Sequence, residues 1–110
     1  MDRQYRRVST EEQHKEGTSL DWQLAKLAEV APNAIDYCDI GYTGTNGLQR
    51  LLQDVQPGDR VLVWKLDRLA RNLRLLLEIE GKLRDMKVPL ISITENIDTS
   101  TAFGRMIDHL

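Results

Sequence analysis

Residues 61–64, Val-Leu-Val-Trp, are the part of the sequence that most narrows the choice of fold. A strand with one face in water alternates apolar and polar side chains, whereas this run is apolar at every position. Such a strand is buried on both faces, which is typical of a parallel sheet covered by helices on each side. The rest of the chain therefore has to supply further strands and amphipathic helices.

The elements predicted around this strand alternate between strand and helix. Residues 4–8, 35–40 and 88–93 are predicted strands, and the early Pro89 indicates a strand start or a sheet edge. Apolar residues at helical spacing predict helices over 20–31, 48–55, 73–86 and 103–110, the first capped by Ser19 and stopped by Pro32. The chain is thus expected to form one α/β domain of three layers, with a mostly parallel sheet of four to five strands and helices on both faces.

Composition limits the compartment and the kind of nucleic-acid contact. Hydrophobic residues make up 41% of the chain and charged residues 29%, a balance typical of a folded domain. No apolar run approaches the roughly 20 residues that span a bilayer, so no membrane partner is expected. The single Cys38 is expected to be a buried small hydrophobe, and the lack of a second cysteine favours a cytoplasmic location. The net charge of −2 argues against holding nucleic acid by bulk positive charge, although arginines gather at residues 3–7 and 68–74.

Two of the expected loops place reactive side chains at one edge of the sheet. In open α/β sheets the functional crevice lies beyond the carboxyl ends of the strands. Ser9 follows the first predicted strand, and the segment from Asp67 to Arg71 follows the third. A serine hydroxyl is a weak nucleophile, and a phosphoryl centre under attack spreads negative charge that arginine binds well. The pattern therefore favours attack of Ser9 on a phosphodiester.

The same residues support other interpretations. Ser9 and Glu12 match a capping box, in which the serine only caps a turn or helix. Arg68, Arg71 and Arg74 repeat at helical spacing, so they are expected along one side of a helix start, where they would equally suit a solvated face. Acyl transfer is less natural, because neither His14 nor His109 has a triad context. A phospho-acceptor receiver domain would require an acidic pair after the first strand.

Four segments resemble the catalytic domain of the serine recombinases, the family of resolvases, invertases and large serine integrases. The sequence Tyr-Arg-Arg-Val-Ser-Thr at residues 5–10 is similar to the opening signature of that family, and Ser-Leu-Asp-Trp-Gln at 19–23 to the stretch that follows. Residues 61–71, a buried strand running into Leu-Asp-Arg-Leu-Ala-Arg, resemble the second signature. Residues 95–104 are similar to the segment before the long dimer helix of the family.

The resemblance implies a resolvase-like fold, roles for individual residues and a DNA partner. Ser9 would attack a DNA phosphate to form a 5′-phosphoserine link, while Arg7, Arg68 and Arg71 hold the phosphate. Asp67 would orient an arginine or assist proton movement, and Gln13, Gln23 and Tyr5 would be secondary phosphate contacts or walls of the site. The family uses no metal or other cofactor, so Asp36 and Asp39 are interpreted as a strand end and loop. Double-stranded DNA, a dimer or tetramer of the full-length protein, and a bacterial or phage-encoded origin are implied as well.

The sequence also departs from the family pattern. The family carries an arginine in the loop before the second helix, whereas residues 43–48 contain none and Arg50 lies on the wrong side of Leu48. The sequence ends at Leu110, before the long helix and the DNA-binding domain of the family. Residues 1–110 are therefore expected to be the catalytic domain of a longer recombinase, inactive in recombination by itself, or else an incomplete dimerisation or regulatory module. The spacing between Gln13 and Ser19 favours the large integrase and transposon recombinase branch.

Overall fold

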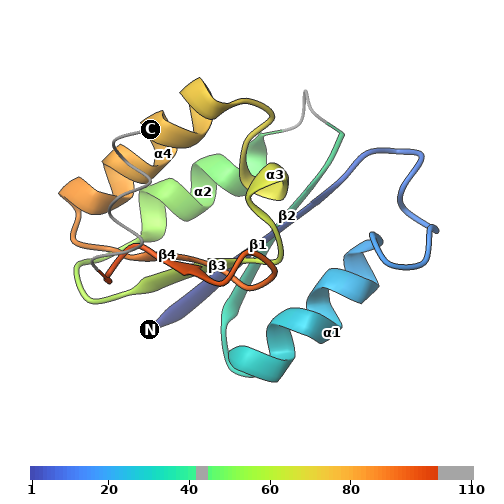
Figure 1. Cartoon of the computed structure of the whole chain (residues 1–110), viewed down its shortest axis with the longest axis horizontal. Helices are drawn as coiled ribbons and strands as arrows, with labels where there is room; N and C mark the ends of the chain where they lie inside the picture. Colours follow the sequence, from blue (N-terminus) through green and yellow to red (C-terminus); the bar gives the residue numbers. More distant parts are fainter. Residues whose placement is uncertain (42–44, 102–110) are drawn as a thin grey trace.

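The computed structural model describes residues 1–41 and 45–101. The strands are β1 (Asp2–Val8), β2 (Ile35–Ile40), β3 (Arg60–Val63), β4 (Leu90–Ser92) and β5 (Ile97–Asp98). The helices are α1 (Leu20–Val30), α2 (Asn46–Asp54), α3 (Leu66–Leu69) and α4 (Leu73–Asp85). Strand and helix alternate along most of this part of the chain, as predicted (Figure 1).

The strands form one sheet in the order β2-β1-β3-β4-β5. Strand β1 pairs in parallel with both β2 and β3, and β3 pairs in parallel with β4. Only β5 runs antiparallel, against β4. The predicted parallel sheet is therefore confirmed, with β1 and β3 at its centre and their carboxyl ends side by side.

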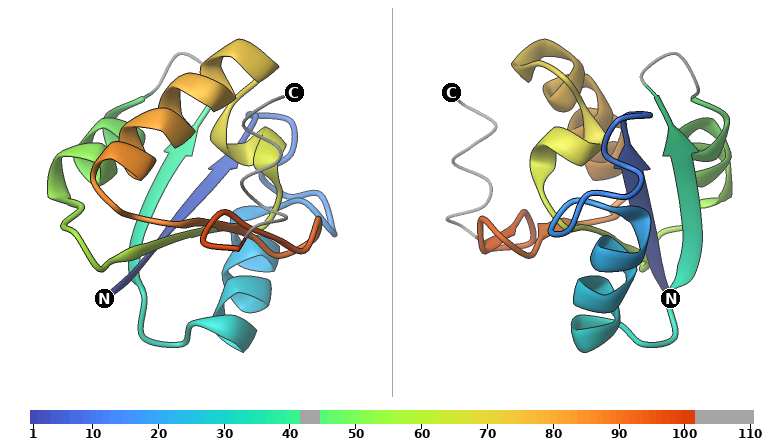
Figure 2. Two further views of the ribbon diagram at one scale, coloured as in Figure 1. Left: turned by 60° about the vertical axis from the view of Figure 1, so that its left-hand side comes forward. Right: turned by 90° about the vertical axis from the view of Figure 1, so that its right-hand side faces the viewer.

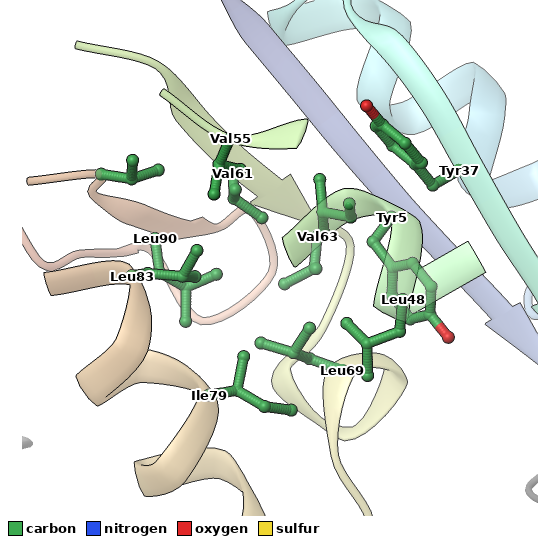
Figure 3. Packing of buried hydrophobic residues seen from close by; sticks show 12 residues of the cluster. Tyr5, Tyr37, Leu48, Val55, Val61, Val63, Leu69, Ile79, Leu83 and Leu90 are labelled. Carbon is green, nitrogen blue, oxygen red and sulfur yellow. The ribbon is translucent and has the colours of Figure 1, made fainter. Parts of the chain in front are cut away.

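Helices cover both faces of the sheet, which confirms the three-layer prediction. Helix α1 packs Leu27 against Leu62 of β3 on one face, in a small cluster that includes Ala31. The other helices pack on the opposite face, where α2 and α4 lie side by side (Figure 2, left). The larger core on that face is shown in Figure 3 and consists of Tyr5, Tyr37, Leu48, Leu51, Val55, Val61, Val63, Leu69, Ile79, Leu83, Val88 and Leu90.

The short helix α3 and strand β5 were not predicted. Helix α3 spans four residues, which is too short for a repeating apolar pattern to show in the sequence. Strand β5 exists because it pairs with β4 across a tight turn in which Asn96 adopts a φ of 54°. Consequently β5 rather than β4 forms that edge of the sheet, and Pro89 marks the start of β4. The helix predicted over 103–110 lies outside the described residues.

Two further sequence-based expectations concern β1 and Cys38. Strand β1 begins at Asp2, two residues earlier than predicted, because its pairing with β3 starts there. The prediction that Cys38 is buried was wrong: it lies on the edge strand β2 and its side chain is exposed, while its neighbours Tyr37 and Asp39 turn inward. Among the described residues, no helix has the length and apolar character needed to cross a membrane.

Candidate active site

The predicted site residues converge at the carboxyl ends of β1 and β3. Arg7 is the penultimate residue of β1, and α3, which carries Asp67 and Arg68, begins two residues after Trp64, just past β3. The Arg68 guanidinium reaches back to β1, where its Nη1 lies 3.4 Å from the carbonyl oxygen of Arg7. Two segments separated by about half the chain therefore meet at this edge, as the parallel topology predicts.

Arg7 is held in a buried network with a tyrosine and an aspartate. Its Nε donates to the Tyr5 hydroxyl (2.9 Å) and its Nη1 donates to the Gly41 carbonyl (2.9 Å). The Tyr5 hydroxyl in turn donates to Asp39 Oδ2 (2.7 Å), which lies 3.6 Å from Arg7 Nη2. Burial, followed by the neighbouring Asp39 carboxylate, raises the pKa of Tyr5, so this hydroxyl remains a neutral donor.

Asp39 is a functional candidate that the sequence interpretation placed only at a strand end. The side chain is buried at the end of β2, and its carboxylate accepts the backbone N–H groups of Gly47 (2.8 Å) and Leu48 (3.0 Å). These donors lie in the first turn of α2, where a negative charge is stabilised. Gly47 approaches β2 so closely that a Cβ would lie 2.5 Å from the Cys38 carbonyl oxygen. Asp39 thus fixes α2 and Arg7 to the same strand edge. Its position two residues after Tyr37, and so on the same face of the strand, was the available signal in the sequence.

Ser9 forms the hydrogen bonds of a capping box with Glu12. The Ser9 amide donates to Glu12 Oε1 (3.0 Å), and the Glu12 amide donates to Ser9 Oγ (3.2 Å). The following residues form turns rather than a helix. Arg68 Nη1 donates to the same Glu12 Oε1 (2.9 Å), which brings the serine, the carboxylate and the arginine into one cluster. This Arg68 hydrogen bond, with help from Ser9, holds the pKa of Glu12 below its usual range.

Asp67 and Arg71 lie on the outer side of this cluster. Asp67 Oδ1 accepts Arg68 Nε (3.0 Å), so the carboxylate orients the guanidinium. Arg71 is exposed in the linker between α3 and α4. Both residues line a cavity of about 240 Å³ between α2 and α4, whose wall consists of Arg7, Thr45, Leu48, Gln49, Leu52, Asp67, Leu69, Ala70, Arg71, Leu75, Ile79 and Lys82. Ser9 is not part of that wall.

The expectation that Arg68, Arg71 and Arg74 share one helix side was wrong. Arg68 belongs to α3, Arg71 to the linker and Arg74 to α4, because the chain leaves the helical path at Ala70. Arg74 is exposed and pairs with Glu78 one turn further along α4. Arg50, the arginine nearest to the family position missing from residues 43–48, lines a different cavity beside β2 together with Asp36 and Asp54. Residues 42–44 of that loop lie outside the described part of the chain.

The two glutamines have different surroundings. Gln23 is completely buried; its amide group donates to the carbonyls of Arg7 and Thr18 (both 2.9 Å), and its Oε1 accepts the Arg7 amide (3.3 Å). Gln23 therefore ties α1 and the loop before it to β1, and Tyr5 is equally inaccessible from outside. Gln13 is half-buried in the loop after Ser9. Among the described residues, no group of three or more histidine, cysteine or acidic side chains could hold a metal ion.

These features define an α/β domain with a serine, buried arginines and their orienting carboxylates at the carboxyl edge of its sheet. The family described as "Resolvase, N terminal domain" matches residues 4–110. The chain therefore belongs to the serine recombinase family, as its signature segments indicated.

Known relatives agree with this assignment in sequence and in structure. The chain is 36% identical over 110 residues to serine recombinase gin of Escherichia phage Mu, and 38% identical over 106 residues to the DNA-invertase of Enterobacteria phage P7. These matches cover 96% of the chain but 53% and 55% of the two relatives, so the chain spans about half their length. The N-terminal catalytic domain of TP901-1 integrase superposes with a TM-score of 0.83 at 34% identity, covering 98% of this chain and 88% of that one.

Proposed function

We propose that the chain is the catalytic domain of a site-specific DNA recombinase in which Ser9 is the nucleophile. Ser9 Oγ loses its proton and bonds to the phosphorus of a DNA phosphodiester. The bond from phosphorus to the 3′ oxygen breaks, and that oxygen takes up a proton. A 5′-phosphoserine link and a 3′-hydroxyl result, and reversal of the step on an exchanged strand rejoins the DNA without an external energy source.

The meeting of Ser9, Arg7 and Arg68 at one sheet edge carries this proposal. A pentacoordinate phosphorus bears negative charge on its non-bridging oxygens, and buried guanidinium groups stabilise that charge strongly. Arg68 Nη1 lies 3.4 Å from the Arg7 carbonyl and 2.9 Å from Glu12, whose amide contacts Ser9 Oγ. Glu12 thus bridges the nucleophile Ser9 and the guanidinium of Arg68 in space.

The remaining site residues take supporting roles in the proposal. Of the two roles open to Asp67, orientation of an arginine has the support of its hydrogen bond with Arg68 Nε. Arg71 is exposed and lines the cavity, where it can reach a phosphate outside the buried cluster. Gln23 and Tyr5 act through the positions of Arg7 and its strand, because neither side chain is accessible. Gln13 remains a candidate for a direct phosphate contact.

The rest of the recombinase, its DNA and its assembly belong to the proposal as well. Double-stranded DNA is the substrate, and cleavage of both strands at two sites requires a dimer or tetramer of the longer protein. We place that protein in the large integrase and transposon recombinase branch. The similarity to the TP901-1 catalytic domain and the long spacing between Gln13 and Ser19 favour this branch, whereas the similarity to phage invertases favours a smaller recombinase.

A catalytically incomplete dimerisation or regulatory module is the second candidate. Two observations favour it: Ser9 makes both hydrogen bonds of a capping box, and residues 43–48 lack the family's loop arginine. The two candidates differ in what they demand of the Ser9 side chain. Asparagine supplies a good cap but no nucleophilic hydroxyl.

The test uses the protein in its natural full length and a duplex of its recombination site with a nick near the centre. The proposal predicts a covalent protein–DNA band on a denaturing gel, mapped to Ser9 and absent from Ser9→Ala. Ser9→Asn should unfold at nearly the same urea concentration as the wild type and still give no band. If neither the wild type nor the variants give a band on DNA that they bind, the regulatory module is the correct candidate.

A further inference from the structure

A single carboxylate oxygen joins the nucleophile to the buried arginine. Glu12 Oε1 accepts hydrogen bonds from the Ser9 amide (3.0 Å) and from Arg68 Nη1 (2.9 Å). One donor lies directly after β1 and the other on α3, so the two converge from different parts of the chain on one anionic oxygen. This arrangement is a ready-made site for an oxyanion.

The contact with Glu12 is the more buried of the two carboxylate contacts that Arg68 makes. The Arg68 side chain is 10% exposed and the Glu12 side chain 21%, while the other carboxylate on Arg68, that of Asp67, is 61% exposed. Asp67 lies next to Arg68 on α3 and moves with it. Glu12 belongs to the loop after β1, and its contact can open without any change in α3.

We propose that Glu12 Oε1 occupies the position that a non-bridging phosphate oxygen takes when DNA binds. This inference rests on the proposed function, because it assigns a ligand to that same site. The phosphate oxygen accepts the same two hydrogen bonds, from the Ser9 amide and from Arg68, and the Glu12 carboxylate leaves. Glu12 is therefore a positioning residue that stands in for the substrate until the substrate arrives.

Displacement of Glu12 changes Ser9 as well. The Glu12 amide donates to Ser9 Oγ (3.2 Å), so it withdraws electron density from the oxygen that has to attack phosphorus. When the loop moves, that hydrogen bond and both bonds to the carboxylate are lost together. Entry of the phosphate and release of the nucleophile are thereby coupled through one residue.

The charge balance of the site supports this exchange. Arg68 is flanked by two carboxylates, Glu12 and Asp67, whose negative charges together exceed the positive charge of its guanidinium, so an approaching phosphate meets no unbalanced positive charge at Arg68. Replacing one carboxylate with the phosphate keeps the count of negative groups around Arg68 unchanged. Without the exchange, the phosphate would have to bind beside two carboxylates, which like-charge repulsion opposes.

The experiment titrates inorganic phosphate into the 110-residue chain and follows the Ser9 amide and the Arg68 Nε–H by NMR, with potassium chloride at equal ionic strength as reference. Glu12→Gln removes the competing charge at constant shape, and phosphate should bind about tenfold more tightly, the equivalent of one charge-assisted hydrogen bond. Glu11→Gln is the matched control, since Glu11 is exposed and its removal changes the net charge equally. Its affinity for phosphate should equal that of the wild type.

Equal phosphate affinity of Glu12→Gln and Glu11→Gln would overturn the inference, as would the absence of any phosphate-dependent shift at Arg68. The wild type gives an independent readout: phosphate should shift the Ser9 and Glu12 amides together with Arg68. A shift at Arg68 alone would mean that phosphate binds without displacing Glu12. Either failure leaves the proposed function standing if the covalent band still depends on Ser9, so the two claims are separable.

Discussion

Strand β1 carries a buried arginine near each end, and each arginine is paired with a tyrosine and an aspartate. At the amino end, Arg3 Nε donates to Asp59 Oδ2 (2.9 Å) and Arg3 Nη1 donates to the Tyr37 hydroxyl (2.8 Å). At the carboxyl end, Arg7 donates to the Tyr5 hydroxyl, but its nearest approach to a carboxylate, Asp39, is 3.6 Å. The residue types are the same at both ends, and the geometry is not.

The difference lies in how the aspartate is satisfied. Asp39 accepts three uncharged donors within 3.0 Å, from Tyr5, Gly47 and Leu48, before Arg7 is considered. Asp59 accepts the Arg3 guanidinium and the backbone amide of Gln56 (both 2.9 Å), and the N-terminal ammonium group lies 3.5 Å from its other carboxylate oxygen. Arg3 is therefore the closer and more buried of the two cations that neutralise Asp59, whereas Arg7 lines a cavity and its aspartate does not depend on it. One arginine stabilises the fold, and the other suits a ligand.

Replacing Arg3 with methionine should give the largest effect. The substitution leaves the buried Asp59 carboxylate without its guanidinium, and breaking a buried pair in this way costs about 3–5 kcal/mol of unfolding free energy. Urea unfolding followed by circular dichroism measures the loss. The double variant Arg3→Met/Asp59→Asn, which carries no orphaned charge, should recover part of it. A loss no larger than that of Arg7→Met would mean that the two arginines are equivalent.

The penalty of Arg3→Met should also shrink in acid. Burial alone would raise the pKa of Asp59, but hydrogen bonds from Arg3 and from the Gln56 amide hold it below its usual range. A carboxyl group with a depressed folded pKa stabilises the protein above its unfolded pKa of about 3.9 and loses this contribution as the pH falls further. Unfolding free energies of wild type and variant should therefore converge below about pH 4. Curves that stay parallel from pH 7 to pH 3 would remove Asp59 as the cause.

Replacing Arg7 with methionine should lower the free energy of unfolding less than Arg3→Met does, but it should abolish the reaction with DNA. The hydrogen bonds to Tyr5 and Gly41 are lost, worth about 1–2 kcal/mol, while Asp39 keeps three donors. In the full-length protein the covalent DNA product should disappear, because Arg7 lies at the phosphate site of the proposal. Urea unfolding and the denaturing gel check the two halves separately. A stability loss as large as that of Arg3→Met would show that Arg7 is structural too.

The order of the elements was predictable because it depends on local signals. The apolar run at 61–64, the cap at Ser19 and the stop before Pro32 each act within a few residues, and the structure has the expected strands and helices there. The meeting of Ser9 with Arg68 followed from parallel topology alone. Arg3, Arg6 and Arg7 looked like one cluster in the sequence, although their partners are Asp59, Asp36 and the Tyr5 network.

The partners of the arginines could not be predicted, because they are set by pairings between distant segments. Asp59 reaches Arg3 only because the turn after α2 lies beside the start of β1, and Asp39 reaches Tyr5 only through the register of β1 with β2. The role of Glu12 as acceptor for Arg68 has the same origin. Its contact with Ser9, by comparison, was present in the sequence as a capping box.

The third arginine of β1 provides the smallest effect and completes the comparison. Arg6 points to the other face of the sheet, where its Nε donates to Asp36 Oδ1 (2.7 Å) and its Nη1 to the Leu20 carbonyl (3.0 Å). Asp36 is exposed and also accepts Gln4 Nε2 (2.9 Å), so removal of Arg6 leaves a hydrated carboxylate rather than a buried one. Arg6→Met should therefore cost about 1 kcal/mol or less. The loss should fall further at high salt, which screens exposed charges, while that of Arg3→Met should hardly change. A salt-independent loss at Arg6 would show that packing of its stem against α1, and not its charge, accounts for the contribution.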